Sequence, residues 1–160
     1  MQSNLLKPLS YNIQASVTKT STFQTAAIEI PLADSYEFIL DVTALSGGAS
    51  GDQTLDVSIQ TAMDYKNAAN AAPATWYTLP ARFAQVNAAT GVSQQMLSVQ
   101  PSLGRGEQAS VEPLAATGGQ LAQNVPLTKK IRLVFTIGGT APSFTFAVWL
   151  VATPKCAGAY

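Results

Sequence analysis

Apolar and polar residues alternate along several short stretches of the chain, a pattern typical of strands with one buried face. The clearest stretch is residues 54–62 (TLDVSIQTA), where Leu55, Val57 and Ile59 share a face. Residues 36–45 (YEFILDVTAL) alternate in the same way. The inward residues of this second stretch are Tyr36, Phe38, Leu40 and Val42. We therefore predict two half-buried strands over these ranges.

Two further alternating runs lie close together near the end of the chain, at residues 131–137 and 144–150. Their apolar faces consist of Ile131, Leu133, Phe135 and Ile137 in the first run and Phe144, Phe146, Val148 and Leu150 in the second. Between the runs, Gly138 and Gly139 permit positive φ angles, and Pro142 has no backbone N–H for a sheet. We therefore predict a loop over residues 138–143 and a β-hairpin formed by the two runs.

Weaker strand patterns occupy the ranges 26–32, 75–79, 82–87 and about 94–99. In the first of them, Pro31 favours an edge position. Near the start, Tyr11, Ile13, Ala15 and Val17 alternate weakly with polar residues, so residues 1–22 are either an arm or an edge strand.

The fold class follows from the seven or eight short strands, the Gly-rich turns between them and the near absence of helical periodicity. These features predict an all-β fold, an antiparallel β-sandwich or jelly roll. A chain of 160 residues suits one domain. We expect an N-terminal arm or edge strand over residues 1–22, a single β-sandwich domain over 23–153 with a long loop at 100–126, and a C-terminal tail over 154–160. Loops as long as 100–126 are commonly functional or disordered.

The charge balance argues against nucleic acid as a partner. Nine Lys and Arg residues offset nine Asp and Glu residues. No basic cluster is present beyond Lys129, Lys130 and Arg132. With 47% hydrophobic and 11% charged residues, much of the surface must consist of small or weakly polar side chains. Such a surface suits a protein that is covered by a partner.

Membrane insertion and export are also unsupported by the sequence. No run approaches the roughly 20 apolar residues that a spanning helix needs. The first residues lack a basic segment followed by an apolar one, so we expect a soluble protein that is not exported.

Residues suited to catalysis are scarce. The chain has no His, the commonest general base and metal ligand, and a single Cys at position 156. Neither a disulfide framework nor a thiolate zinc site can be built, and we interpret Cys156 as an incidental thiol. The segment 103–107 (LGRGE) lacks the Lys-Ser/Thr ending and the helix of a phosphate-binding loop. We therefore predict no enzyme, no catalytic or metal-binding residues and no cofactor.

Two sets of side chains still offer alternatives. Asp41 and Asp56 lie on outward faces of strands that we expect to pair, where they form either a carboxylate pair suited to hydrolysis or two solvated residues. The rings of Trp76, Tyr77 and Trp149 form either a platform for sugars or ordinary core and rim positions.

Three segments, at about 38–64, 76–94 and 131–151, contain an ordered series of short motifs. The series is an LDVTA strand, a Gly/Ser turn, a TLDVSIQT strand, a WYTLP element and a closing TIGGTAPSFTF hairpin. In this order the chain resembles a family of small tailed-phage virion proteins, often described as head decoration proteins. The resemblance implies a structural role and carries no catalytic residues. The chain departs from the family in its longer start, residues 1–22, and in most of residues 100–126.

We accordingly expect a phage virion structural protein, a capsid decoration (cement) protein that binds and stabilises the head shell. Its partners would be the major capsid protein or other virion proteins, contacted through residues 1–22 and 100–126. It would form a homo-oligomer, such as a trimer, on the capsid surface after synthesis in the host cytoplasm. Neither nucleic acid nor a membrane is expected as a partner. The alternatives are a carbohydrate-binding β-sandwich module of a tail or fibre, through Trp76, Tyr77 or Trp149, and a head–tail connector component.

Overall fold

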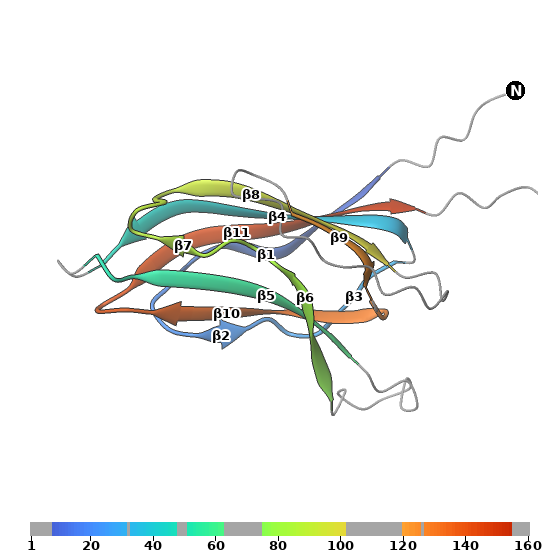
Figure 1. Ribbon diagram of the computed structural model, residues 1–160, viewed down its shortest axis with the longest axis horizontal. Helices are drawn as coiled ribbons and strands as arrows, with labels where there is room; N and C mark the ends of the chain where they lie inside the picture. Colours follow the sequence, from blue (N-terminus) through green and yellow to red (C-terminus); the bar gives the residue numbers. More distant parts are fainter. Residues whose placement is uncertain are drawn as a thin grey trace, which may run out of the picture.

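The structure is a computed structural model that describes residues 8–31, 33–47, 51–62, 75–101, 120–125 and 127–154. These residues form β-strands and no helix. The strands are β1 (Leu9–Lys19), β2 (Phe23–Gln24), β3 (Ile28–Glu29), β4 (Ala33–Ser46), β5 (Thr54–Ala62), β6 (Trp76–Arg82), β7 (Val86–Asn87), β8 (Ser93–Pro101), β9 (Gln120–Val125), β10 (Lys130–Gly138) and β11 (Ser143–Pro154). They build two sheets that lie face to face (Figure 1). The predicted all-β sandwich is confirmed.

The sheet that we name sheet A has the strand order β1-β11-β4-β8-β9. Its pairs are antiparallel except that β9 runs parallel to β8. In sheet B the order is β2-β10-β5-β6, with β3 also paired to β10 and β7 to β5. All pairs of sheet B are antiparallel. The chain therefore passes repeatedly between two layers.

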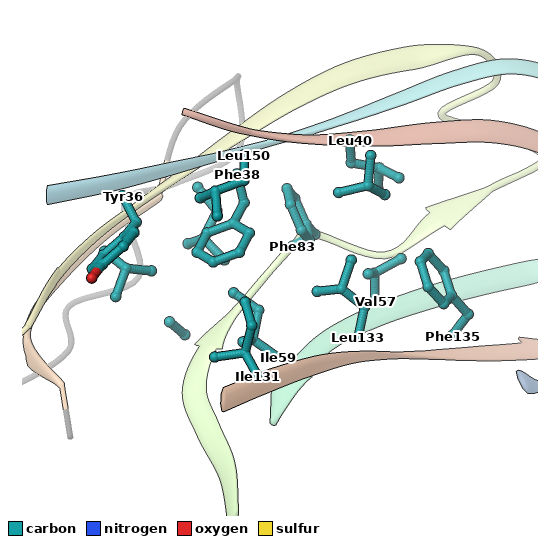
Figure 2. Close-up of a cluster of buried hydrophobic side chains, with 14 of the residues drawn as sticks. Tyr36, Phe38, Leu40, Val57, Ile59, Phe83, Ile131, Leu133, Phe135 and Leu150 are labelled. Carbon is teal, nitrogen blue, oxygen red and sulfur yellow. The ribbon is translucent and has the colours of Figure 1, made fainter. Parts of the chain in front are cut away.

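The core fills the space between the sheets, because every second side chain of the long strands points inward. The inward residues predicted for residues 36–45 and 54–62 are all buried, as are Leu133 of β10 and Leu150 of β11. Figure 2 shows Phe38 and Leu40 of sheet A above Val57 and Ile59 of sheet B.

Three phenyl rings join the two sheets near the β1 and β2 edge. The centroid of Phe135 on β10 lies 4.6 Å from that of Phe23 and 4.8 Å from that of Phe146 on β11. The Lys19 ammonium lies 4.8 Å from the Phe23 ring centroid and covers this end of the stack. The predicted inward positions of both C-terminal runs are therefore correct.

The predicted pairing of those two runs is wrong. Strand β10 pairs with β5 in sheet B, whereas β11 pairs with β1 and β4 in sheet A, so residues 138–143 cross between the sheets. The turn is held from outside, because Asp52 accepts hydrogen bonds from Thr140 N (3.0 Å) and Thr140 Oγ1 (2.9 Å). Gly139 has φ of 101°, and a Cβ there would lie 2.6 Å from the Asp52 carbonyl oxygen. A Gly-rich break permits a sharp reversal in the sheet plane or between sheets, and local pattern does not distinguish the two.

The two segments proposed for docking turn out to be partly regular structure. Within residues 1–22, Leu9–Lys19 form the edge strand β1. Within residues 100–126, Gln120–Val125 form β9, so the prediction of one continuous loop is wrong for this part. Residues 1–7 and 102–119 lie outside the described residues.

Candidate functional site

The outer face of sheet A carries three large apolar side chains in one line across the strands. Trp149 on β11 lies opposite Ile39 on β4, and Ile39 lies opposite Met96 on β8. Trp149 is 40% exposed, Met96 is 41% exposed and Ile39 is partly exposed. We name these three residues the apolar row. Because neighbouring strands lie about 4.8 Å apart, the row is roughly 10 Å long.

Along β11, the residues on either side of Trp149 on this face are Ala147 and Val151. They extend the apolar surface at right angles to the apolar row, since residues two apart on a strand share a face. Asn12 on β1 lies opposite Trp149 on the other side. Three of the four nearest positions around Trp149 are therefore aliphatic: Ala147, Val151 and Ile39.

Two carboxylates flank the centre of the apolar row. Glu37 and Asp41 lie two residues before and after Ile39 on β4, so all three share the outer face. Glu37 is opposite Val151 and Ser98, and Asp41 is opposite Ala147 and Gln94. Each carboxylate therefore has Ile39 beside it along β4 and one aliphatic residue of β11 opposite it.

Positive charge is missing from this face among the described residues of β1, β4, β8 and β11. The one cation of these strands is Lys19, which lies over the Phe23 ring. Neither Glu37 nor Asp41 forms an ion pair with a described residue, and the ion pair of Lys130 with Glu29, at 3.7 Å, lies on sheet B. The outer face of sheet A is therefore apolar at its centre and acidic at both borders.

The outer face of sheet B is organised differently, because its polar side chains bond to one another. The Arg132 guanidinium lies 4.4 Å from the Trp76 ring centroid, and Arg132 Nε donates to Gln60 Oε1 at 2.7 Å. Gln60 Nε2 donates to Thr78 Oγ1 at 2.9 Å. On the same face, Asp56 accepts hydrogen bonds from Gln85 Nε2 at 3.1 and 2.9 Å.

The structure does not bring together Asp41 and Asp56, the carboxylate pair that the sequence left open. Asp41 lies on the outer face of sheet A and Asp56 on the outer face of sheet B, with the core between them. The expectation was wrong because β4 and β5, although consecutive along this part of the chain, belong to different sheets. The hydrolase hypothesis loses the pair on which it rested.

The aromatic platform, the other alternative that the sequence left open, is not assembled either. Trp76 and Tyr77 are adjacent on β6 and point to opposite sides of the strand. Arg132 covers Trp76, whereas Tyr77 is 47% exposed where β6 begins. Trp149 lies on the outer face of the other sheet, apart from both of these rings.

Several remaining predictions fall outside the described residues, namely those on Cys156 and on residues 103–107. The described residues contain no group of three or more Cys, Asp or Glu side chains that could hold a metal ion. None of their elements is a helix long and apolar enough to cross a membrane.

Sequence reasoning identified Trp149 but not the rest of the apolar row. The signal for Ile39 was an apolar residue in the outward phase of YEFILDVTAL, between Glu37 and Asp41. The outward phase of β8 shows the same feature at Met96. Their alignment across strands depends on register, which no local pattern contains.

Comparison of the chain with protein-family models, curated proteins and solved structures finds no match. The likeness to phage virion proteins therefore stays a prediction.

Proposed function

We propose that the protein is a structural component of a tailed-phage virion, a capsid decoration (cement) protein that binds and stabilises the head shell. The observation that supports this most is the partly exposed apolar row of Trp149, Ile39 and Met96 on the outer face of sheet A. Burying apolar surface is favourable by about 25 cal/mol per Å². Covering such a face with a partner therefore lowers the free energy of the complex.

The rest of the described surface fits a binding protein better than an enzyme. Asp41 and Asp56 are separated by the core, and Asp56 and Arg132 of sheet B bond to neighbours on their own face. A decoration protein needs no reactive group, since many weak contacts repeated by symmetry add up to strong attachment.

The strand order suggests a more specific name for the fold. Without the additional strand β9, sheet A reads β1-β11-β4-β8 and sheet B reads β2-β10-β5-β6, with the first and last strands of the chain adjacent. We infer that this arrangement is a jelly roll, a double-sheet fold that occurs in viral capsid proteins and in lectins. A fold alone does not assign a function, so this inference favours both roles equally.

The proposed partner is the major capsid protein or another virion protein, at the capsid surface, after synthesis in the host cytoplasm. A homo-oligomer such as a trimer on the shell would multiply the contacts. Strands β1 and β9, from the two segments first proposed for docking, lie at the two edges of sheet A. The proposed contacts therefore centre on this sheet.

The experiment that tests the proposal compares particles with and without the protein. Particles that lack it should assemble but burst at a lower temperature or in a weaker osmotic shock, and purified protein should restore their resistance. A protein that binds the intact lattice and not its dissociated parts stabilises the lattice by about 2.7 kcal/mol per site when its free concentration is 100 times Kd. Equal robustness with and without the protein would reject the cement role. Failure to form heads or to join tails would indicate a connector.

A carbohydrate-binding module of a tail or fibre is the second candidate, because Trp149 presents an exposed ring beside Asn12 on a flat face. Aromatic faces stack on the apolar faces of sugars. The platform of several rings that would favour this role is missing from the described residues.

A further inference from the structure

The apolar row and its two carboxylates together define the chemistry of a partner. Four residues of extended strand separate Glu37 from Asp41, or about 13 Å, so each carboxylate-bearing position lies roughly 6–7 Å from the row. The row itself runs across the strands for about 10 Å. The face therefore resembles a short apolar track with one negative charge on each side.

An α-helix matches these dimensions. With its side chains a helix is about 10–12 Å wide. A helix lying along the row, across the strands, would place its apolar seam on Trp149, Ile39 and Met96. Its two borders would then lie above Glu37 and Asp41, where Lys or Arg side chains would meet carboxylates that have no ion-pair partner among the described residues.

We propose that this face binds an amphipathic helix whose apolar seam is bordered on both sides by Lys or Arg. The proposal rests on the proposed function, in which the shell partner carries the helix. Charge complementarity is the deciding feature, since the described outward residues of β1, β4, β8 and β11 include carboxylates and no cation.

A sugar fits the same face less well. Sugar sites need several hydrogen-bonding groups beside the stacking ring, yet of the four nearest positions around Trp149 only Asn12 is polar, and aliphatic residues occupy the other three. Ile39 and Met96 offer no second aromatic face. Aliphatic neighbours instead match the side chains of a helix seam.

The chain supplies matched controls for the test, because each outer face carries one Trp and one Asp. Trp149→Thr and Asp41→Asn alter sheet A, whereas Trp76→Thr and Asp56→Asn make the same chemical changes on sheet B. Glu37→Gln tests the second border. All five variants are first checked for folding by circular dichroism and thermal melting, and those that fold are compared.

The experiment measures binding of fluorescently labelled protein to purified particles that lack it, at low and high salt. Loss of a central Trp anchor should raise Kd by about thirtyfold for Trp149→Thr. Asp41→Asn and Glu37→Gln should each raise Kd by about threefold to tenfold at low salt and by less at high salt. The sheet B variants should stay within about twofold of the wild type.

The outcomes separate the proposal from the function on which it rests. If wild-type protein does not bind the particles, the cement function fails and the proposal fails with it. If the wild type binds and the sheet A variants bind equally well, the cement function stands and this docking face is rejected. If Trp149→Thr weakens binding but Asp41→Asn and Glu37→Gln do not, the proposed Lys or Arg residues at the borders of the helix are rejected. Binding that is lost after periodate oxidation of the particles identifies a glycan and overturns the helix.

Discussion

The two outer faces of the sandwich differ in how many of their side chains form hydrogen bonds or ring contacts with one another. On sheet B, Arg132 is held by the Trp76 ring and by Gln60, and Asp56 is held by Gln85. On sheet A, Trp149 and Met96 are 40% and 41% exposed, beside carboxylates that have no ion-pair partner among the described residues.

This difference shows where a partner would contribute most. Covering sheet B would break hydrogen bonds that already exist and would remove polar groups from water, which costs free energy unless the partner replaces them. Covering the apolar row would bury surface that the fold itself leaves exposed. The faces share one core, so their contrast must come from the outward residues alone.

The largest expected effects test that shared core. Phe135→Ala in sheet B and Phe146→Ala in sheet A should each lower the free energy of unfolding by about 3–5 kcal/mol, because both rings are fully buried and truncation leaves a cavity. Chemical denaturation of the two variants measures this. A clear difference between the two losses in free energy of unfolding would show that the sheets do not contribute equally to the core.

The controls for the core variants are the neighbouring outward residues, Thr136→Ala and Thr145→Ala. Thr136 is exposed, and Thr145 Oγ1 shares a 2.8 Å hydrogen bond with Thr18 Oγ1. Each should cost under about 1.5 kcal/mol. A loss at Thr145 as large as that at Phe146 would mean that the register of β11 is shifted by one residue.

The next effect concerns the connection that carries the chain from sheet B to sheet A. The buried Tyr36 hydroxyl donates to the Pro31 carbonyl oxygen at 2.5 Å and accepts from Ala33 N at 3.2 Å. Tyr36→Phe removes both hydrogen bonds and should cost about 1–3 kcal/mol in chemical denaturation. The control, Tyr77→Phe, removes a hydroxyl from a ring that is 47% exposed.

The same residue predicts a dependence on alkaline pH. Burial raises the pKa of Tyr36 above its ordinary value of 10.0, and the hydrogen bond from Ala33 offsets part of this increase. Since the folded state favours the neutral phenol, its contribution is complete below pH 10 and is lost as the pH rises above that value. The stability difference between wild type and Tyr36→Phe should therefore stay constant up to about pH 9 and shrink as the pH rises above about 10. A constant difference would contradict the assignment.

The sequence predicted the layers of this fold better than their connections. Strict alternation located the inward faces of β4, β5, β10 and β11, because burial of one face imposes a period of two on each strand. It could not choose between a hairpin and a crossover at residues 138–143, since glycine permits either. The choice rests on contacts far apart in the chain, such as Thr140 with Asp52.

The same limit explains why the carboxylate pair, an alternative that the sequence left open, does not form. Asp41 and Asp56 could approach only if their consecutive strands paired, yet β4 and β5 belong to different sheets. The apolar row shows the reverse case, in which residues far apart in the sequence come together. Its members Ile39, Met96 and Trp149 are distant in sequence and meet through the registers of β4, β8 and β11.

A smaller effect tests whether the polar network of sheet B stabilises the fold. Arg132→Ala removes the contact with Trp76 and the hydrogen bond to Gln60, and it should cost about 1 kcal/mol. Arg82→Ala, an exposed arginine on the same sheet, should cost under about 0.5 kcal/mol. If the two variants lose the same free energy of unfolding, the contacts of Arg132 do not stabilise the fold. The outer face of sheet B would then be no better stabilised by its own contacts than that of sheet A.

The smallest expected effect is on the face where the largest loss of binding is proposed. Trp149→Thr keeps a residue that favours strands, so the isolated protein should lose under about 1 kcal/mol, the value of one cross-strand pair with Ile39. Part of that loss is offset because the variant exposes less apolar surface to water. The measurement is urea denaturation of the free protein, beside Phe146→Ala as a reference for a buried ring on the same strand. A loss of about 3 kcal/mol or more would place Trp149 with the core residues, whose truncation costs that much. Its exposure would then be incidental to packing, and the contrast between the two faces would disappear.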